Sequence, residues 1–309
     1  MSQTAMVFPG QGSQKVGMLA DLAQDPILVE VFETVSREVD RDLRRLAVEG
    51  PAEDLDSTTV TQPLMLAADV AFYAIQRARG GLLPGVVAGH SLGEYPALYA
   101  AGVLELPALA RLVVVRARLM QEAVAPGAGA MAAILGLDDE ALEAVCRTVT
   151  GGIVEPVNYN CPGQIVIAGE RAAVEEAMAA ARAAGAKRAL LLPVSVPAHS
   201  SLMKTASRAY AHELAQIDFK PPVLPVVHNA DLAAHPDPPS IREALVAQLA
   251  SPVRWTETIQ HLRDRYGVSR IVECGPGRIL LGLDRRIAPE LEHRSLEDRE
   301  TILQYAEIR

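Results

Sequence analysis

Ser91 lies in the stretch GHSLG, which runs from Gly89 to Gly93. A Gly-x-Ser-x-Gly pattern between a strand and a helix is typical of a nucleophile elbow, a sharp turn whose flanking positions need glycine to avoid clashes. The apolar run GVVAG before the serine predicts the strand, and a helix ending at Gly102 is predicted after it. We therefore interpret Ser91 as a nucleophile. The alternative is a serine that caps the N-terminus of the following helix.

A serine nucleophile needs a general base, which is normally a histidine. His199 ends the stretch LLLPVSVPAH, a predicted strand followed by a proline-stiffened loop, and such loops often present catalytic side chains. His90 directly precedes the serine, and the side chains of adjacent residues diverge. The other five of the seven histidines lie in polar helical contexts or near a proline-rich loop: His212, His228, His235, His261 and His293. His199 is thus the predicted base, although no acidic partner for it is evident.

The stretch FPGQGSQ near the N-terminus raises the question of a phosphate-binding loop. Its glycines have the wrong spacing for a dinucleotide fingerprint, and no Gly-Lys-Ser/Thr follows, so neither common phosphate loop is matched. Backbone amides of this loop could instead join the amide of Leu92 in an oxyanion hole. The alternative interpretation is a tight turn without a chemical role.

Strands and helices alternate along the chain in a way that predicts an α/β fold. Ala5 to Phe8 reads as a buried strand, and helical periodicity covers Ile27 to Leu46, Pro63 to Arg79 and Pro107 to Ala123. This alternation predicts a mostly parallel sheet, as in an α/β-hydrolase-like main domain.

The segment from Gly129 to about Val194 follows a different pattern, with elements in the order βαββαβ. This order is the ferredoxin-like signature, and a unit of this size can form its own small domain within a larger chain. We expect a main domain of residues 1–126 and 199–309, with a small ferredoxin-like domain of residues 127–198 inserted in it.

Composition excludes several function classes. The formal net charge of −9 and the lack of a basic run argue against nucleic acid as a partner. No apolar stretch is long enough to cross a bilayer and no signal peptide is recognisable, so we expect a cytoplasmic protein that binds no membrane. The three cysteines, Cys146, Cys161 and Cys274, lack the paired spacing of a zinc site, and no metal is expected.

Eight segments of the chain together resemble the bacterial malonyl-CoA:acyl carrier protein transacylases. The resemblance runs from about Met6 to Ile287, and the segments agree in order and spacing with the family. They are VFPGQGSQKVGM, GPAEDLDSTTVTQP, AGHSLGEYPAL, VVRARLMQEA, GAMAAILGL, VNYNCPGQIVIAG, LPVSVPAHSSLM and VECGPGRIL.

The resemblance implies roles for the residues around the serine. Ser91 would carry the acyl group, and His199 would be its base. The amides of Gln11 and Leu92 would form the oxyanion hole. In this family a backbone carbonyl holds the histidine, here that of Gln248, which implies that no triad aspartate should be sought.

Two further residues match family positions that contact the substrate. Arg116 matches the arginine that pairs with the free carboxylate of a malonyl group, a task that suits a planar guanidinium with two parallel donors. Its alternative is a solvated helix arginine such as Arg118. Asn160 matches an asparagine near the acyl and pantetheine path. The chain departs from the family at Cys161, where serine is usual, and at Ala198, where many relatives carry a bulkier or polar residue that helps to exclude methylmalonyl.

The resemblance implies a ping-pong acyltransferase of fatty acid biosynthesis. Its partners would be malonyl-CoA and acyl carrier protein, with no cofactor, and the chain is expected to be a monomer. A malonyl-loading subunit of a malonate decarboxylase or a polyketide pathway is an alternative with the same chemistry. A serine thioesterase or other serine hydrolase would share Ser91 and His199 but would have no reason to place Arg116 in the pocket. A non-catalytic module that docks carrier proteins would not need Ser91 and His199 together.

Overall fold

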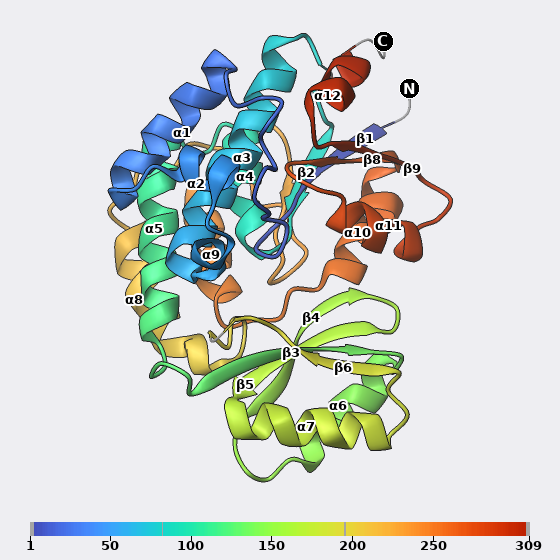
Figure 1. The fold of residues 1–309 in the computed structure, drawn as a ribbon. Coiled ribbons are helices and arrows are strands. Elements are labelled where there is room, and N and C mark those ends of the chain that lie inside the picture. Colours follow the sequence, from blue (N-terminus) through green and yellow to red (C-terminus); the bar gives the residue numbers. More distant parts are fainter. Residues whose placement is uncertain (1–2, 82, 195, 307–309) are drawn as a thin grey trace.

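Two separate β-sheets form the frame of the protein (Figure 1). The computed structural model describes residues 3–81, 83–194 and 196–306. The first sheet is five-stranded, and every strand pair in it is parallel. Its strands, in spatial order, are β7 (Val226–Val227), β2 (Val86–Gly89), β1 (Gln3–Phe8), β8 (Val268–Cys274) and β9 (Glu292–Leu296).

Helices cover both faces of this parallel sheet. Side chains of β1 alternate between the two faces: Met6 and Phe8 belong to one apolar cluster, and Ala5 and Val7 belong to another. A strand that is buried on both faces reads as a continuous apolar run, which explains the sequence of β1. The helices outside the second sheet are α1 (Pro26–Val39), α2 (Leu43–Glu49), α3 (Thr58–Ala78), α4 (Glu94–Ala100), α5 (Leu106–Glu122), α8 (Lys204–Leu214), α9 (Pro238–Gln248), α10 (Trp255–Tyr266), α11 (Ile279–Ile287) and α12 (Arg299–Ala306). Short 3-10 helices span Ala52–Asp56, Ser91–Gly93 and Ser201–Met203.

The second sheet is antiparallel and has two helices packed on one face (Figure 1). Its strands, in spatial order, are β4 (Val154–Cys161), β5 (Gln164–Glu170), β3 (Gly129–Leu135) and β6 (Arg188–Leu191), and its helices are α6 (Asp139–Thr148) and α7 (Arg171–Ala183). The order along the chain is βαββαβ, as predicted. The predicted α/β class with a mostly parallel main sheet is confirmed. The domain boundaries at 126/127 and 198/199 stay a prediction, and the chain ends at residues 1 and 309 lie outside the described residues.

Two predicted helix boundaries are wrong. The periodic stretch from Ile27 to Leu46 is not one helix, because Asp40 adopts a left-handed φ of 50° and ends α1 before α2 begins. The helix predicted to begin at Pro63 begins at Thr58. Proline is most common in the first turn of a helix, so its position suggested the start, but here the burial of the whole helix outweighs the missing amide hydrogen bond.

Within the described ranges, no helix is both long enough and apolar enough to cross a membrane. The same ranges contain no cluster of three or more histidine, cysteine, aspartate or glutamate side chains that could hold a metal ion.

The turn after β2 packs directly against β1. A Cβ atom on Gly93 would lie 2.1 Å from the carbonyl oxygen of Phe8, and one on Gly89 would lie 1.9 Å from the carbonyl carbon of Gly93. Both distances are far below van der Waals contact, so neither position has room for a side chain. The glycines at both ends of GHSLG let the strand, the turn and helix α4 approach this closely, and the approach fixes where Ser91 stands.

We expect Gly93→Ala to lower the free energy of unfolding by about 1–3 kcal/mol, the usual cost of forcing extra atoms into a packed core. Gly282→Ala is the matched control, because Gly282 lies within helix α11 and a Cβ there meets no atom within 4 Å. Removing a helical glycine at an open site should raise stability by up to about 1 kcal/mol. Urea unfolding measures both, and equal effects of the two substitutions would contradict the close packing described for Gly93.

Candidate active site

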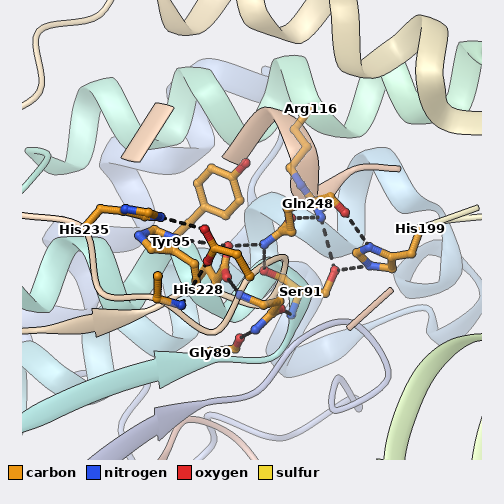
Figure 2. Close-up of polar contacts among 12 residues, drawn as sticks. Gly89, Ser91, Tyr95, Arg116, His199, His228, His235 and Gln248 are labelled. Carbon is orange, nitrogen blue, oxygen red and sulfur yellow. Dashed lines mark hydrogen bonds and ion pairs between the residues drawn. The ribbon is translucent and has the colours of Figure 1, made fainter. Parts of the chain in front are cut away.

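Ser91 and His199 meet although 108 residues separate them in the chain. Ser91 follows β2, and His199 lies in the loop between β6 and α8. The Oγ atom of Ser91 is 2.7 Å from Nε2 of His199 (Figure 2). Both residues have a left-handed backbone, with φ of 54° at Ser91 and 66° at His199. Residues other than glycine rarely adopt this backbone conformation, and those that do are concentrated at functional sites.

A backbone carbonyl holds the imidazole of His199 from its other side. Nδ1 of His199 lies 2.9 Å from the carbonyl oxygen of Gln248, the last residue of α9. A carbonyl oxygen can only accept, so Nδ1 carries the hydrogen and Nε2 is left to accept from Ser91. No carboxylate hydrogen-bonds this ring among the described residues. This geometry accounts for the absence of an acidic triad partner in the sequence.

The surroundings of His199 keep its imidazole neutral. Its burial, and next the positive charge of Arg116, lower the pKa of His199 from the ordinary 6.5 to about 3. At neutral pH the ring is therefore an unprotonated acceptor, the form that a general base requires.

Arg116 brings a buried positive charge to the same serine. Its side chain is 1% exposed, and Nη2 donates to Oγ of Ser91 over 3.1 Å. Nη2 also donates to Oε1 of Gln248 over 2.9 Å, and Nη1 donates to Oε1 of Gln62 over 2.7 Å. All three acceptors are neutral, and no described carboxylate forms an ion pair with this guanidinium. A buried charge without an opposite charge is costly, so the site is suited to an anion supplied by a ligand.

The pocket that contains Ser91 lies between the two sheets. Gln11, in the turn after β1, and Leu92, in the short helix Ser91–Gly93, both line it, and no loop or turn backbone hydrogen bond uses either amide among the described residues. Much of the remaining wall is apolar and comes from α5, β3 and the chain around His199: Met120, Met131, Leu192, Val194, Val196 and Ala198. Backbone donors beside a nucleophile in an apolar pocket can stabilise a developing oxyanion.

Asn160 does not line the pocket, and unlike Gln248, which also lies outside the lining, it has no hydrogen bond to Ser91, His199 or Arg116 in the described chain. Its Oδ1 is 2.8 Å from Nε2 of His90, and it is His90 and Asn158 that line the pocket. The structure therefore brings Asn160 to His90 but not to Ser91.

Three side chains near Ser91 were not predicted from the sequence. Gln62 is the acceptor for Arg116 described above. Asn229 accepts from the backbone N–H of Ser91 through Oδ1 over 2.7 Å and donates to the carbonyl of Gly89 over 2.8 Å. Glu94, the fully buried first residue of α4, accepts from Asn229 and Gln248. The one signal for Glu94 was a charged residue in an apolar helix. Asn229 and Gln62 carried none.

Comparison with known proteins gives concordant matches over nearly the whole chain. Residues 5–278 match the family model described as an acyl transferase domain. The malonyl CoA-acyl carrier protein transacylase of Escherichia coli K12 is 50% identical over 300 residues, which cover 96% of this chain and 97% of that protein. The protein of the same name from Bacillus subtilis is 42% identical over 305 residues, covering 98% and 96%.

Solved structures similar to this chain are also malonyltransferases. An acyl carrier protein S-malonyltransferase from Vibrio cholerae superposes with a TM-score of 0.92 at 48% identity, covering 97% of this chain and 99% of that one. A malonyl-transacylase solved in complex with its type II PKS acyl-carrier protein superposes with a TM-score of 0.97 at 49% identity, and all of both chains is covered.

The lowered pKa of His199 should make stability depend on pH. A histidine whose pKa is lowered by folding binds its proton more readily in the unfolded state, so stability is lost as pH falls from 6.5 towards 3. His199→Asn keeps a donor for the carbonyl of Gln248 but cannot titrate. Between pH 7 and pH 5, the free energy of unfolding should fall by about 2 kcal/mol more in the wild type than in His199→Asn. Denaturant unfolding at each pH measures this, and parallel curves would contradict the lowered pKa.

Proposed function

This chain belongs to the acyl transferase family, among the bacterial malonyl CoA-acyl carrier protein transacylases, and we propose that the malonyl transfer it catalyses proceeds through an ester on Ser91. One observation carries the proposal. Oγ of Ser91 lies 2.7 Å from Nε2 of His199 and 3.1 Å from Nη2 of Arg116, so a base and an anion-binding cation converge on one hydroxyl.

In the first half-reaction, Ser91 attacks the thioester carbonyl of malonyl-CoA. His199 takes the hydroxyl proton at Nε2 while the Oγ–carbon bond forms, and the imidazolium keeps its Nδ1 hydrogen bond to the Gln248 carbonyl. The amides of Gln11 and Leu92 stabilise the oxyanion of the tetrahedral intermediate. The carbon–sulfur bond then breaks, His199 returns the proton to the departing sulfur, and CoA leaves a malonyl ester on Ser91.

In the second half-reaction, the phosphopantetheine thiol of acyl carrier protein attacks that ester. His199 accepts the thiol proton and passes it to Oγ of Ser91 as the ester bond breaks. One thioester has been exchanged for another of similar energy, so the reaction is reversible. His199 accepts and returns one proton in each half-reaction and so ends in the state in which it began. All the reacting groups belong to the chain and its two substrates.

Arg116 pairs with the malonyl carboxylate in this proposal. In a malonyl ester on Ser91, one methylene separates the ester carbonyl from the free carboxylate. Because Arg116 already contacts Oγ of Ser91, its guanidinium is close enough to bind that carboxylate. The carboxylate would also offset the positive charge that is the second cause of the lowered His199 pKa. Binding of malonyl should therefore raise the basicity of His199 just when it is needed to accept a proton.

A polyketide carrier is a second candidate acceptor. The superposition on a malonyl-transacylase in complex with a type II PKS acyl-carrier protein favours it, because the two chains match over their whole length. Fatty acid biosynthesis remains our first proposal, since the relatives from Escherichia coli and Bacillus subtilis are transacylases named without a polyketide carrier. Malonyl transfer to purified carriers of both kinds distinguishes the two candidate acceptors.

We propose further that the protein is a cytoplasmic monomer that binds neither nucleic acid nor membrane. The formal net charge of −9 supports the exclusion of nucleic acid.

The ester on Ser91 is directly testable. Malonyl-CoA without a carrier should leave a malonyl group on the protein, detected by intact mass and located on Ser91 by peptide mapping. Ser91→Ala should abolish it, and His199→Ala should slow both half-reactions by roughly 10²- to 10⁴-fold, the usual contribution of a general base. Label found on Cys161 or Cys274 would refute the assignment. Burial raises the pKa of both thiols, so neither is expected to react.

Arg116 should determine the preference for malonyl over acetyl. Arg116→Ala should impair loading from malonyl-CoA far more than loading from acetyl-CoA, because acetyl has no carboxylate to lose. Arg116→Lys should restore part of the preference, since an ammonium cannot offer two parallel donors. Arg118→Ala is the matched control, an exposed arginine on the same helix. Equal proportional losses for malonyl and acetyl would show that Arg116 has a structural role only.

A further inference from the structure

Glu94 anchors two side chains that hold the backbone of Ser91 from opposite sides. The carboxylate is fully buried at the start of α4. One oxygen accepts from the backbone N–H of Asn229, and the other accepts from Nε2 of Gln248. Asn229 accepts from the Ser91 N–H over 2.7 Å. Gln248 donates to the Ser91 carbonyl over 2.9 Å (Figure 2).

The same two side chains reach the other reacting groups. Oε1 of Gln248 accepts from Arg116 over 2.9 Å, and its backbone carbonyl holds Nδ1 of His199 over 2.9 Å. Nδ2 of Asn229 donates to the Gly89 carbonyl at the end of β2. The nucleophile, its base and the buried cation are therefore each one hydrogen bond away from a residue that Glu94 anchors.

Only a carboxylate can fill this position. Asn229 and Gln248 present N–H donors to Glu94, Nδ1 of His228 lies 3.8 Å from Oε2, and a carboxylate has two oxygens that accept without offering a hydrogen. An amide has one acceptor oxygen, so one of the two donors would face an NH₂ group. Either Asn229 or Gln248 would then shift, and both contact the strained backbone of Ser91.

We propose that Glu94 is a positioning residue for the transfer reaction: through Asn229 and Gln248 it holds Ser91 at its left-handed φ of 54°, with Oγ aimed at His199. Glu94 itself makes no hydrogen bond to Oγ of Ser91 or to the ring of His199 within the described chain. This inference rests on the proposed function of Ser91. Displacing a nucleophile by about 1 Å can cost on the order of 100-fold in rate, so loss of the anchor should be seen in catalysis.

The test compares Glu94→Gln with Glu273→Gln. Glu273 is also fully buried and also accepts from two N–H groups, those of Leu280 and Leu281, but it has no hydrogen bond to Ser91, Asn229 or Gln248. Burial raises the pKa of Glu273 to about 7, so the comparison is made at about pH 8, where it is mainly a carboxylate. The two substitutions create the same conflict between donors, one beside Ser91 and the other at the start of α11.

Single-turnover malonylation of Ser91 from malonyl-CoA is measured per folded molecule, with thermal unfolding as the stability readout. Both variants should lose stability. Glu94→Gln should lower the maximal acylation rate roughly 10- to 100-fold with little change in the malonyl-CoA concentration at half-maximal rate, and Glu273→Gln should acylate at the wild-type rate. Glu94→Asp keeps the charge on a shorter side chain and should give an intermediate rate.

A wild-type acylation rate in folded Glu94→Gln would overturn the proposal, and so would an equal loss of rate in Glu273→Gln. If Glu94→Gln gives no folded protein, Glu94→Asp decides instead, and a wild-type rate in that variant would overturn it equally. Failure of the proposed function is distinguishable, because wild-type protein would then form no ester on Ser91 before any variant is compared.

Discussion

The left-handed backbone at Ser91 is the constraint on which the rest of the site depends. A serine at a φ of 54° has Oγ lifted out of the turn, where a base and a substrate can reach it, but the conformation is unfavourable for any residue with a side chain. It persists because the chain around it leaves no alternative. Gly93 packs against β1 with no room for a Cβ atom, and Asn229 and Gln248 hold the N–H and the carbonyl of Ser91.

The second governing feature is a positive charge that the protein buries without a carboxylate. Arg116 hydrogen-bonds two glutamine side chains and a hydroxyl, so its charge is solvated by neutral dipoles until an anion arrives. Burial of His199, and next this same charge, lower the pKa of its imidazole and keep it unprotonated. In the mechanism that we propose, selectivity for a carboxylate-bearing acyl group and the unprotonated state of the base would both depend on this charge. An acyl group without a carboxylate would form no ion pair with Arg116.

The two sheets supply different parts of the site. The parallel sheet supplies Ser91 at the end of β2, and the helices around it supply Arg116 and Gln248. The antiparallel sheet supplies apolar wall residues such as Met131. Polar groups that must hold their positions thus come from the larger, doubly covered core, and the second sheet closes the pocket opposite them.

Local patterns in the sequence determined the parts of this protein that depend on neighbouring residues. The GHSLG turn was predicted because strand, turn and helix are set by sterics within about ten residues, and the βαββαβ order was predicted because periodicity is local. The wrong start of α3 shows the limit, since burial of the whole helix decided whether Pro63 was tolerated. The pairing of His199 with a backbone carbonyl was reached only through the family resemblance. The roles of Glu94, Asn229 and Gln62 emerged only from the tertiary structure, because their partners lie 54 to 154 residues away. A charged residue in an apolar helix marked Glu94 as unusual, but nothing local in the sequence identified its partners.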